Sequence, residues 1–588
     1  MNQVQKANFR LECQDDHPGF TVTHTTREIE TGLFHTLIRF THTVPFEPKC
    51  TRFHWNIPAE NVAGFWQPTA DFNKRIFADW EKEILESRIS VDAPLFAVFD
   101  NRDHNSMIIA CSDAVNAVHI QASYREEDDH IHGQLTLFGE KHSQIESYET
   151  TLRIDLRPLY FGECLKQCSS WWENFEALRP ADIPPTALLP VYSTWYQFHQ
   201  ELNTDILIEE CRLASKLGYG LIILDDGWQT KDNNRGYDFT GDWLPERIPH
   251  MKTFCEAVHQ TGMKLAVWYS VPFCGIKSKA YQKFKTKLLT TEHRWAPVFD
   301  PRYPEVREHL ISNYKRALLE WNIDGFKLDF IDEFRVYPST VLTQENGRDY
   351  ASVNEAVYRL LSDCIRELKA IKPDVVIEFR QKYIGPAMRT FGHMFRAFDC
   401  PGDYTTNRVR ICDLRLTSGT TAVHSDMFTY HPDAQLEVKA LQLTNILFSV
   451  PQLSIELKKA KPDEQKMIGF YTHYWITHKK ILMEGNFTAH GPLQNYPILE
   501  STLDATSICS ISSDTFLCKE QLPDTIHIIN AKLTTAIVLK TTVTQEIFSI
   551  CILDCQGQKV RSETITVNQP LLLFEVPPCG MLQMKKVS

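Results

Sequence analysis

The sequence contains no uninterrupted run of eighteen apolar residues, and the segment from Met1 to Cys13 lacks the apolar core of a secretory signal. We therefore expect a soluble chain without a membrane-spanning helix. It also lacks a basic run that could follow a phosphate backbone, since 62 Lys and Arg against 74 Asp and Glu give a formal net charge of −12. Nucleic acid and membranes are accordingly not expected partners.

The sixteen cysteines are scattered singly, and no CxxC pair is present that would indicate a zinc site or a redox dithiol. Unpaired thiols persist in a reducing compartment, so we expect a cytoplasmic protein, or a periplasmic one if a leader was removed. The P-loop, GxSxG, HExxH and paired-glycine dinucleotide motifs are also missing from any suitable strand and helix. These absences exclude the commonest nucleotide-dependent and serine or zinc hydrolase classes.

A chain of 588 residues is about four times the length of a typical domain, and three regions differ in pattern. Residues 1–180 carry short apolar runs between polar turns, which predict an N-terminal antiparallel β-sandwich. Residues 181–484 alternate buried strands with amphipathic helices, and eight candidate strands predict a (β/α)₈ TIM barrel. Residues 485–588 return to short apolar runs, which predict a C-terminal antiparallel β-sandwich domain.

In a barrel of this kind the active site lies at the carboxyl ends of the strands, and three apolar runs end in aspartate. The most informative run extends from Gly325 to Phe330, where a period of two places Lys327 and Asp329 on the same inward face. A neighbouring ammonium group lowers the pKa of a buried carboxyl and keeps it ionised. This suits a nucleophile or a ligand, although an ion pair that merely closes a barrel layer is the alternative.

The second run leads into Asp225, Asp226, Gly227 and Trp228. Adjacent carboxylates would face opposite ways in a strand, so at least one of them must lie beyond it. Carboxylates accept hydrogen bonds from sugar hydroxyls, and an indole ring offers a flat face to sugar C–H groups. Trp195 and Trp268 near other predicted strand ends also favour a carbohydrate ligand, although an Asp-Gly turn beside a core tryptophan would give the same pattern.

The third run extends from Met394 to Asp399 and is followed by Asp403, a further candidate acid or base. Arg396 and Asp399 are three positions apart, so a regular strand would direct them to opposite faces. A bulge or a strand end is required if both line the site.

Taken in order, the Asp-Asp-Gly-Trp motif, the Lys-x-Asp motif and the later Arg and Asp resemble the retaining α-galactosidases of glycoside hydrolase family 36 and its clan. The resemblance implies the nucleophile Asp329 and the acid/base Asp399, with Asp403 as a rival. It also implies that Asp225, Asp226, Lys327 and Arg396 bind substrate hydroxyls. The sequence departs from the family where Phe398 replaces a serine and where Phe330 follows Leu328-Asp329.

The activity implied is hydrolysis of terminal α-galactosyl residues of oligosaccharides by double displacement. We expect Phe398 and the charged nucleophile to raise the pKa of Asp399. No metal site or organic cofactor is implied, and only the resemblance suggests a homo-oligomer. The alternatives are a related α-glycosidase (an α-N-acetylgalactosaminidase or an α-glucosidase-like enzyme), an α-galactosyl transferase, and a non-catalytic sugar-binding protein.

Overall fold

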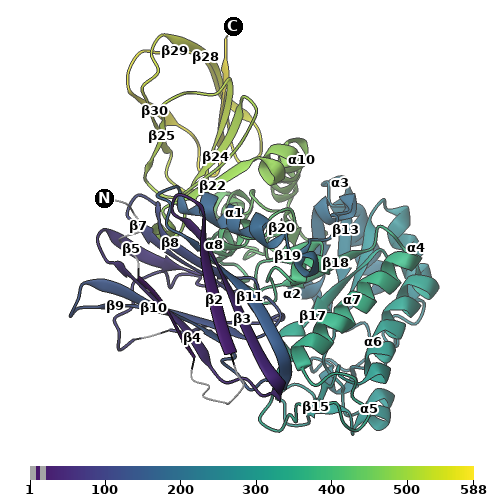
Figure 1. Ribbon diagram of the computed structural model, residues 1–588. Helices are drawn as coiled ribbons and strands as arrows, with labels where there is room; N and C mark the ends of the chain where they lie inside the picture. Colours follow the sequence, from purple (N-terminus) through teal and green to yellow (C-terminus); the bar gives the residue numbers. More distant parts are fainter. Residues whose placement is uncertain (1–7, 14–20, 82, 588) are drawn as a thin grey trace.

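The computed structural model describes residues 8–13, 21–81 and 83–587, which form three parts (Figure 1). The N-terminal part is a sandwich of two antiparallel sheets. The first sheet has the order β1 (Asn8–Cys13), β4 (Thr51–Pro58), β10 (His130–Leu137), β9 (Val118–Arg125), β6 (Leu85–Ser87). The second has the order β2 (Thr21–Glu30), β3 (Leu33–Phe46), β11 (Ile145–Asp155), β8 (Asn105–Cys111), β7 (Leu95–Asp100), β5 (Val62–Trp66). In β4, buried side chains alternate with half-buried ones, as expected when one face of a sheet meets the other sheet.

The central part is a parallel sheet of eight strands rolled into a barrel, which confirms the predicted TIM-barrel fold. In chain order its strands are β12 (Val191–Ser193), β13 (Leu221–Leu224), β14 (Lys264–Ser270), β17 (Gly325–Asp329), β18 (Val376–Arg380), β19 (Met394–Arg396), β20 (Ala422–His424) and β21 (Gln452–Leu453). Strand β21 pairs with β12, and bridges from His424 to Val450 and from Phe428 to Leu453 bring β20 toward β21. All four residues of β13 are buried, because the barrel interior covers one face and helices cover the other.

Helices surround the barrel, as the alternating pattern predicts. They include α3 (Thr204–Lys216), α4 (Met251–Gln260), α6 (Pro304–Arg316), α7 (Val353–Ile371), α8 (Tyr404–Arg415), α9 (Leu436–Thr444) and α10 (Pro462–Glu484). Helix α7 illustrates how they form: Ser352 caps its N-terminus by accepting the Glu355 amide, and its buried residues recur at helical spacing from Val353 to Leu368. The apolar stripe faces the barrel.

The C-terminal part is also built of β-strands, as predicted. Its larger sheet has the order β22 (Asn486–His490), β23 (Ile498–Leu503), β24 (Thr506–Ile511), β26 (Thr525–Asn530), β31 (Met581–Lys586), β28 (Glu546–Leu553), β29 (Lys559–Val567). The smaller sheet has the order β25 (Phe516–Lys519), β27 (Ala536–Thr541), β30 (Leu571–Glu575). The elements of all three parts fall within the predicted ranges 1–180, 181–484 and 485–588, whose boundaries stay a prediction.

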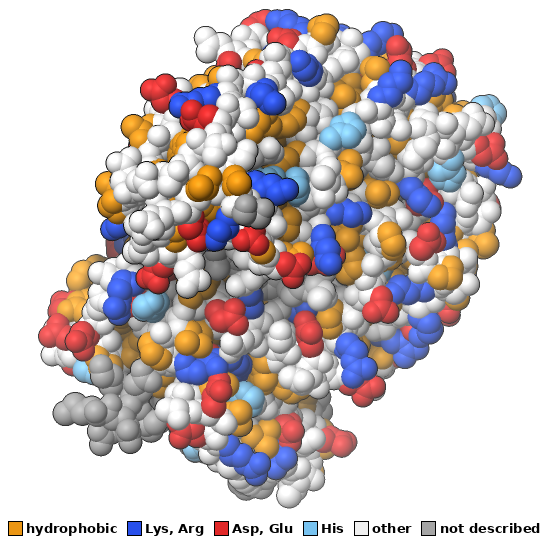
Figure 2. Space-filling view, turned by 90° about the horizontal axis from the view of Figure 1, so that it is seen from above, with side chains coloured by type: hydrophobic (Ala, Val, Ile, Leu, Met, Phe, Trp, Pro, Cys, Tyr) orange, Lys and Arg blue, Asp and Glu red, His pale blue; other side chains and the backbone are white. Residues whose placement is uncertain are grey.

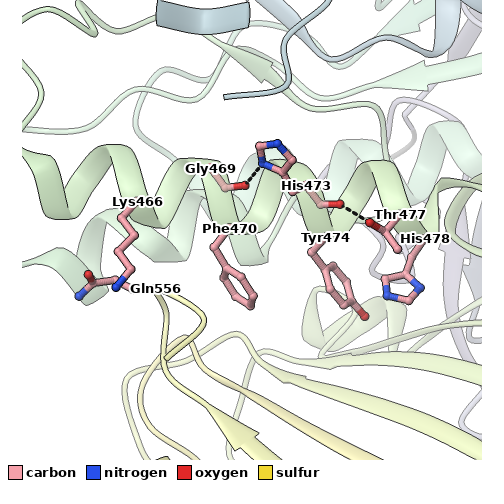
Figure 3. A pocket seen from close by; sticks show the side chains of 8 residues that line it. All are labelled: Lys466, Gly469, Phe470, His473, Tyr474, Thr477, His478 and Gln556. Atoms are coloured by element: carbon pink, nitrogen blue, oxygen red, sulfur yellow. Dashed lines mark hydrogen bonds between the residues drawn. The ribbon is translucent and has the colours of Figure 1, made fainter. Parts of the chain in front are cut away.

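Two hollows in the surface lie away from the strand ends of the barrel. A groove of about 440 Å³ runs along α10, where Phe470 and Tyr474 face the C-terminal part (Figure 3). A larger hollow of about 730 Å³ lies between the N-terminal sandwich and α7, and its lining includes Tyr148 and Tyr358. Neither is formed by residues that follow barrel strands, so neither is the active site expected for this fold.

The described surface carries charges of both signs. On the face shown in Figure 2, basic and acidic side chains of the described residues are interspersed, and no large area is basic alone. Among the described residues, no helix is both long enough and apolar enough to cross a bilayer.

A buried polar cluster joins the three parts of the chain. Lys74 of the N-terminal sandwich lies 3.0 Å from the Asp413 carboxylate of α8, and both side chains are buried. The same carboxylate accepts the Trp66 indole N–H at 2.9 Å and the Tyr496 hydroxyl of the C-terminal part at 2.6 Å. Burial raises the pKa of Asp413 to about 6, although Lys74, Tyr496 and Trp66 act in the opposite direction. The three parts therefore meet at one carboxylate.

Replacing Lys74 with methionine is expected to lower the free energy of unfolding by about 3 to 5 kcal/mol, because it leaves the buried Asp413 charge unpaired. The control is Arg75→Met, which breaks an exposed ion pair with Glu81 of 2.8 Å and is expected to cost less than about 1 kcal/mol. Thermal and urea melting would measure both variants. Equal effects of the two changes would contradict the role given to the buried cluster.

Candidate active site

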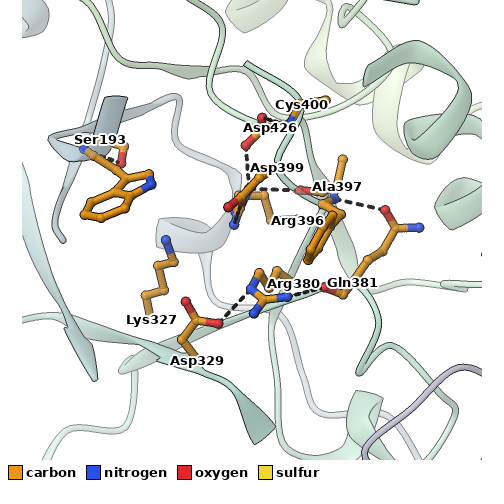
Figure 4. A network of polar contacts seen from close by, with 12 residues as sticks. Ser193, Lys327, Asp329, Arg380, Gln381, Arg396, Ala397, Asp399, Cys400 and Asp426 are labelled. Carbon is orange, nitrogen blue, oxygen red and sulfur yellow. Dashed lines mark hydrogen bonds and ion pairs between the residues drawn. The ribbon is translucent and has the colours of Figure 1, made fainter. Parts of the chain in front are cut away.

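Strand β17 supplies two charged side chains at the carboxyl end of the barrel. Lys327 and Asp329 alternate with the buried apolar residues Phe326 and Leu328, as a strand period of two requires. The strand ends at Asp329, and Phe330 has a φ of 64°, so Phe330 does not continue the face of Phe326 and Leu328. The predicted placement of Lys327 and Asp329 beside each other is what the structure has (Figure 4).

The Asp329 carboxylate is held by three side chains from neighbouring strands and the loops after them. It accepts hydrogen bonds from the Trp268 indole at 2.9 Å, the Arg380 Nε at 2.7 Å and the Tyr383 hydroxyl at 2.8 Å. Its side chain is 9% exposed. Burial alone would raise the pKa of Asp329, but Arg380, Lys327 and these hydrogen bonds outweigh it and hold the pKa well below its usual range. Asp329 is therefore an ionised, oriented carboxylate.

Asp225 and Asp226 both lie beyond β13, which ends at Leu224. The Lys327 ammonium lies 2.6 Å from the Asp225 carboxylate, so the lysine pairs with Asp225 across the barrel. Asp226 accepts hydrogen bonds from the Gln200 and Gln229 amides at 3.0 and 2.7 Å. Burial raises the pKa of Asp226 to about 7. The two adjacent carboxyls thus have different partners.

Asp399 lies in a loop after β19, which ends at Arg396. Because the strand stops there, the chain turns and the Arg396 guanidinium reaches the Asp399 carboxylate at 2.8 Å. The Asp399 side chain remains 41% exposed, whereas Asp329 is nearly covered. Figure 4 shows both carboxylates directed toward the same central space, with Lys327 beside them.

The expected rise in the pKa of Asp399 is wrong. Burial does raise the pKa, but Arg396, Lys327 and Arg380 outweigh burial and lower it. Phe398 does not supply an apolar setting, because the guanidinium of Arg380 lies over its ring at 4.9 Å. In the free protein Asp399 therefore favours the ionised state.

Asp426 is a third carboxyl in this cluster, on the loop after β20, and it is fully buried. It lies 2.5 Å from the Arg396 guanidinium and accepts the Tyr196 hydroxyl at 2.8 Å and the Cys400 amide at 2.7 Å. Burial raises the pKa of Asp426 to about 6, against the effect of Arg396. Asp399 and Asp426 thus share one guanidinium.

Several predicted site residues have other roles in the structure. Asp403 caps the N-terminus of α8 by accepting the Thr406 amide at 2.9 Å, which accounts for this carboxylate without a role in acid/base chemistry. Trp228 is fully buried, donates to the Trp268 carbonyl at 2.9 Å and stacks on Trp243, so its expected sugar-binding face is covered.

The remaining predictions are placed as follows. Trp268 directs its indole N–H at Asp329. Trp195 is half-buried in the short helix α2 (Trp195–Phe198), beyond the strand in which it was predicted, and Arg235 lies over its ring at 4.8 Å. Arg396 is buried; its Nη1 donates to Asp426 and the Ala397 carbonyl, and its Nη2 donates to Asp399. Its contact with substrate hydroxyls stays a prediction.

Sequence reasoning left Arg380, Tyr383 and Asp426 out of the site. Arg380 ends β18 and Asp426 follows β20, so their position at strand ends was a visible signal. Tyr383 lies in the loop after β18, where no periodicity applies. Together the residues give one ionised carboxylate, a second, more exposed carboxyl, and polar groups around them, which is an arrangement suited to acid/base-assisted substitution at carbon.

Comparisons show that the chain is similar to known proteins in part of its sequence and in its fold. A family model described as Melibiase matches residues 187–379. The α-galactosidase Mel36A of Lactobacillus acidophilus is 24% identical over 201 residues, covering 32% of this chain and 26% of the relative. The α-galactosidase 2 of Pediococcus pentosaceus is 25% identical over 269 residues, covering 40% of this chain and 36% of the relative. The matched segments thus span only a quarter to about a third of these relatives' own lengths.

Solved structures match over almost the whole chain. The family 36 α-galactosidase AgaA of Geobacillus stearothermophilus superposes with a TM-score of 0.63 at 14% identity, covering 99% of this chain and 87% of AgaA. The galactosidase domain of the α-galactosidase-sucrose kinase AgaSK gives a TM-score of 0.65 at 10% identity, covering 99% and 85%. At these identities the likeness shows the fold alone.

Proposed function

We propose that this chain, a glycoside hydrolase family 36 α-galactosidase-like protein, is a retaining α-galactosidase that removes terminal α-galactosyl residues from oligosaccharides. The observation that carries the proposal is the pair Asp329 and Asp399, directed toward one space from the ends of two barrel strands. Supporting it, the Melibiase family model matches residues 187–379, relatives named α-galactosidases match part of the chain, and a variant of AgaA was solved in complex with raffinose.

In the first step the Asp329 carboxylate attacks the anomeric carbon, and the bond from that carbon to the leaving oxygen breaks. Asp399 gives its proton to the leaving oxygen, so the aglycone departs as an alcohol and a glycosyl ester of Asp329 remains. The low pKa of Asp329 supplies the ionised nucleophile. The exposure of Asp399 suits a group that meets the departing part of the substrate on the solvent side.

In the second step water attacks the same carbon, and Asp399 accepts its proton while the ester bond to Asp329 breaks. Two inversions give net retention of the α configuration. Arg380 and Tyr383 bind the Asp329 oxygen and stabilise the carboxylate as it leaves. Asp225, Asp226 and Lys327 surround the sugar and offer acceptors and one donor for its hydroxyls.

Asp426 gives the acid step a dependence on pH. When Asp426 is ionised, its charge offsets that of Arg396 and favours the proton on Asp399. In Asp426→Asn the positive charge of Arg396 is no longer offset by a carboxylate at position 426, so the pKa of Asp399 falls further. Since Asp399 must be protonated to donate, the decline of kcat/KM with rising pH is expected to move to lower pH, costing roughly tenfold in kcat/KM for raffinose at pH 7.

A pH profile of kcat/KM on raffinose and on 2,4-dinitrophenyl α-galactoside checks this expectation. The dinitrophenolate leaves without a proton, so its profile should be nearly unchanged in the variant. A decline that moves to higher pH, or that moves equally for both substrates, would contradict the assignment.

The identity of the sugar is tested by comparing aryl α-galactoside, α-glucoside, α-xyloside and α-N-acetylgalactosaminide. The galactosaminide matters most, because the A type blood α-D-galactosamine galactosaminidase of Flavonifractor plautii is 25% identical over 174 residues. We expect α-galactose to be released before any β anomer, and proton NMR would identify the anomer that appears first. Activity on the galactosaminide alone would keep the mechanism and change the substrate.

Transfer to a second sugar would use the same residues, and adding an acceptor during product analysis separates transfer from hydrolysis. We also propose a cytoplasmic location, supported by the free state of the fifteen cysteines between Cys50 and Cys579. Assembly into a homo-oligomer is likewise a proposal, which light scattering of the purified protein would test.

A further inference from the structure

Several side chains hold the backbone of the loop that carries Asp399. Residues 397–403 lie between β19 and α8 and belong to no helix or strand. The Phe398 amide donates to the Gln381 side chain at 3.0 Å, and the Cys400 amide donates to Asp426 at 2.7 Å. Gln381 and Asp426 both follow barrel strands, so these two contacts belong to the barrel itself.

Two carbonyls of the same segment are bound by Arg410 of α8. Its Nη1 donates to the Phe398 and Asp399 carbonyls, each at 3.1 Å, and its guanidinium lies over the Phe398 ring at 5.4 Å. A planar guanidinium that makes several bonds at once fixes direction as well as distance. Arg410 therefore determines how the backbone of Asp399 is placed, while Arg396 binds its carboxylate.

Arg410 is in turn oriented by the N-terminal sandwich. Asp71, on the connection between β5 and β6, accepts from Arg410 Nε with both oxygens at 3.1 Å and from Nη2 at 2.7 Å. Asp71 has a φ of 49°, in the left-handed region, and its carbonyl accepts the Lys74 ammonium. Lys74 pairs with Asp413, one turn further along α8. Two ion pairs thus hold the β5–β6 connection against α8: in one the connection supplies the acidic residue, and in the other it supplies the basic residue.

We propose that Asp71 is a positioning residue for the acid/base group: through Arg410 it holds the backbone of Asp399, so the N-terminal sandwich is part of the catalytic apparatus. This inference rests on the proposed retaining mechanism. Without its carboxylate partner, the Arg410 side chain can leave the Phe398 and Asp399 carbonyls. The Phe398 and Asp399 carbonyls then lose their partner, while the amide contacts of the loop and the pair between Arg396 and the Asp399 carboxylate remain. The Asp399 carboxyl shifts relative to the leaving oxygen.

The effect of such a shift depends on the leaving group. Sugar leaving groups need a proton, and a displacement of about 1 Å in a catalytic group can cost on the order of 10²-fold in rate. A dinitrophenolate needs none. The loss of rate on the two substrates therefore distinguishes two kinds of residue. A residue that positions only the acid/base group affects the sugar leaving group alone, whereas a residue that stabilises the whole fold affects both substrates.

The test compares Asp71→Asn with wild type on raffinose and on 2,4-dinitrophenyl α-galactoside. The expected result is a loss of roughly 10- to 100-fold in kcat/KM on raffinose and less than about twofold on the aryl substrate. Asp71→Glu keeps the charge and is expected to restore part of the raffinose activity. Glu81→Gln is the matched control, because Glu81 lies on the same connection and, among the residues that the structure describes, forms its ion pair with the exposed Arg75 at 2.8 Å; it should change neither rate.

Equal losses on both substrates in a folded Asp71→Asn protein, or no loss on either, would overturn the proposal. Circular dichroism and thermal melting establish that the variant is folded. Failure of the proposed function looks different, since wild type would then cleave neither α-galactoside. Asp399→Ala reports separately whether the leaving-group readout works in this protein.

Discussion

Asp329→Ala is expected to abolish hydrolysis of every α-galactoside, with kcat lowered by about 10⁴-fold or more, because no group remains to form the covalent intermediate. The loss should be independent of the leaving group, since the nucleophile is needed whether or not the departing oxygen requires a proton. Hydrolysis of raffinose and of 2,4-dinitrophenyl α-galactoside, measured with the same preparation, checks this.

Azide provides a second measurement on the same variant. It can occupy the space left by the Asp329 side chain and attack the anomeric carbon of the activated substrate. One displacement inverts the configuration, so β-galactosyl azide is expected, and proton NMR identifies it. Formation of the α azide, or full activity without azide, would show that Asp329 is not the nucleophile.

The matched control is Asp324→Asn, at the opposite end of the same strand. Asp324 is paired there with Lys372 at 2.8 Å and with His259 at 2.7 Å. Residues at the amino end of the barrel strands usually contribute to stability and not to catalysis. The variant is expected to melt at a lower temperature and to keep its kcat, which separates loss of chemistry from loss of fold.

The barrel could be predicted because its strands are buried on both faces and end in polar residues, a local signal. Lys327 and Asp329 on β17 were placed by strand period, and the structure has them there. At least one of Asp225 and Asp226 was expected beyond its strand, and the structure has both beyond β13. Tryptophans gave a poorer signal. An indole can stack on a sugar or on another indole, and Trp228 does the latter with Trp243.

The charge of Asp399 could not be predicted, because the sequence does not show that Arg396, three positions away, and the more distant Lys327 and Arg380 all act on its carboxylate. The neighbour Phe398 suggested an apolar setting, but the guanidinium groups of Arg380 and Arg410 lie over its ring at 4.9 and 5.4 Å. Nothing in the pattern around Asp71 indicates that it reaches α8, since docking between domains leaves no periodic signal. The sequence therefore predicts candidates for the reacting groups, while the fold determines their protonation and placement.

Asp399→Ala is expected to divide the substrates into two classes. For raffinose, kcat/KM should fall by roughly 10² to 10⁴-fold, because the leaving sugar no longer receives a proton. For 2,4-dinitrophenyl α-galactoside the first step should be little affected, while the second step slows for lack of a base. The covalent intermediate then accumulates, and a burst of one equivalent of dinitrophenol should precede a slow steady state.

Azide again gives the decisive product, with the opposite configuration. In Asp399→Ala, Asp329 still forms the intermediate, and azide replaces water in the second displacement, so α-galactosyl azide is expected. Asp403→Asn serves as the control: loss of a helix cap should cost about 1 kcal/mol in stability and leave the leaving-group dependence unchanged. If instead Asp403→Asn shows the burst and the azide product, the proton donor is Asp403, and the low pKa of Asp399 marks a substrate-binding carboxylate.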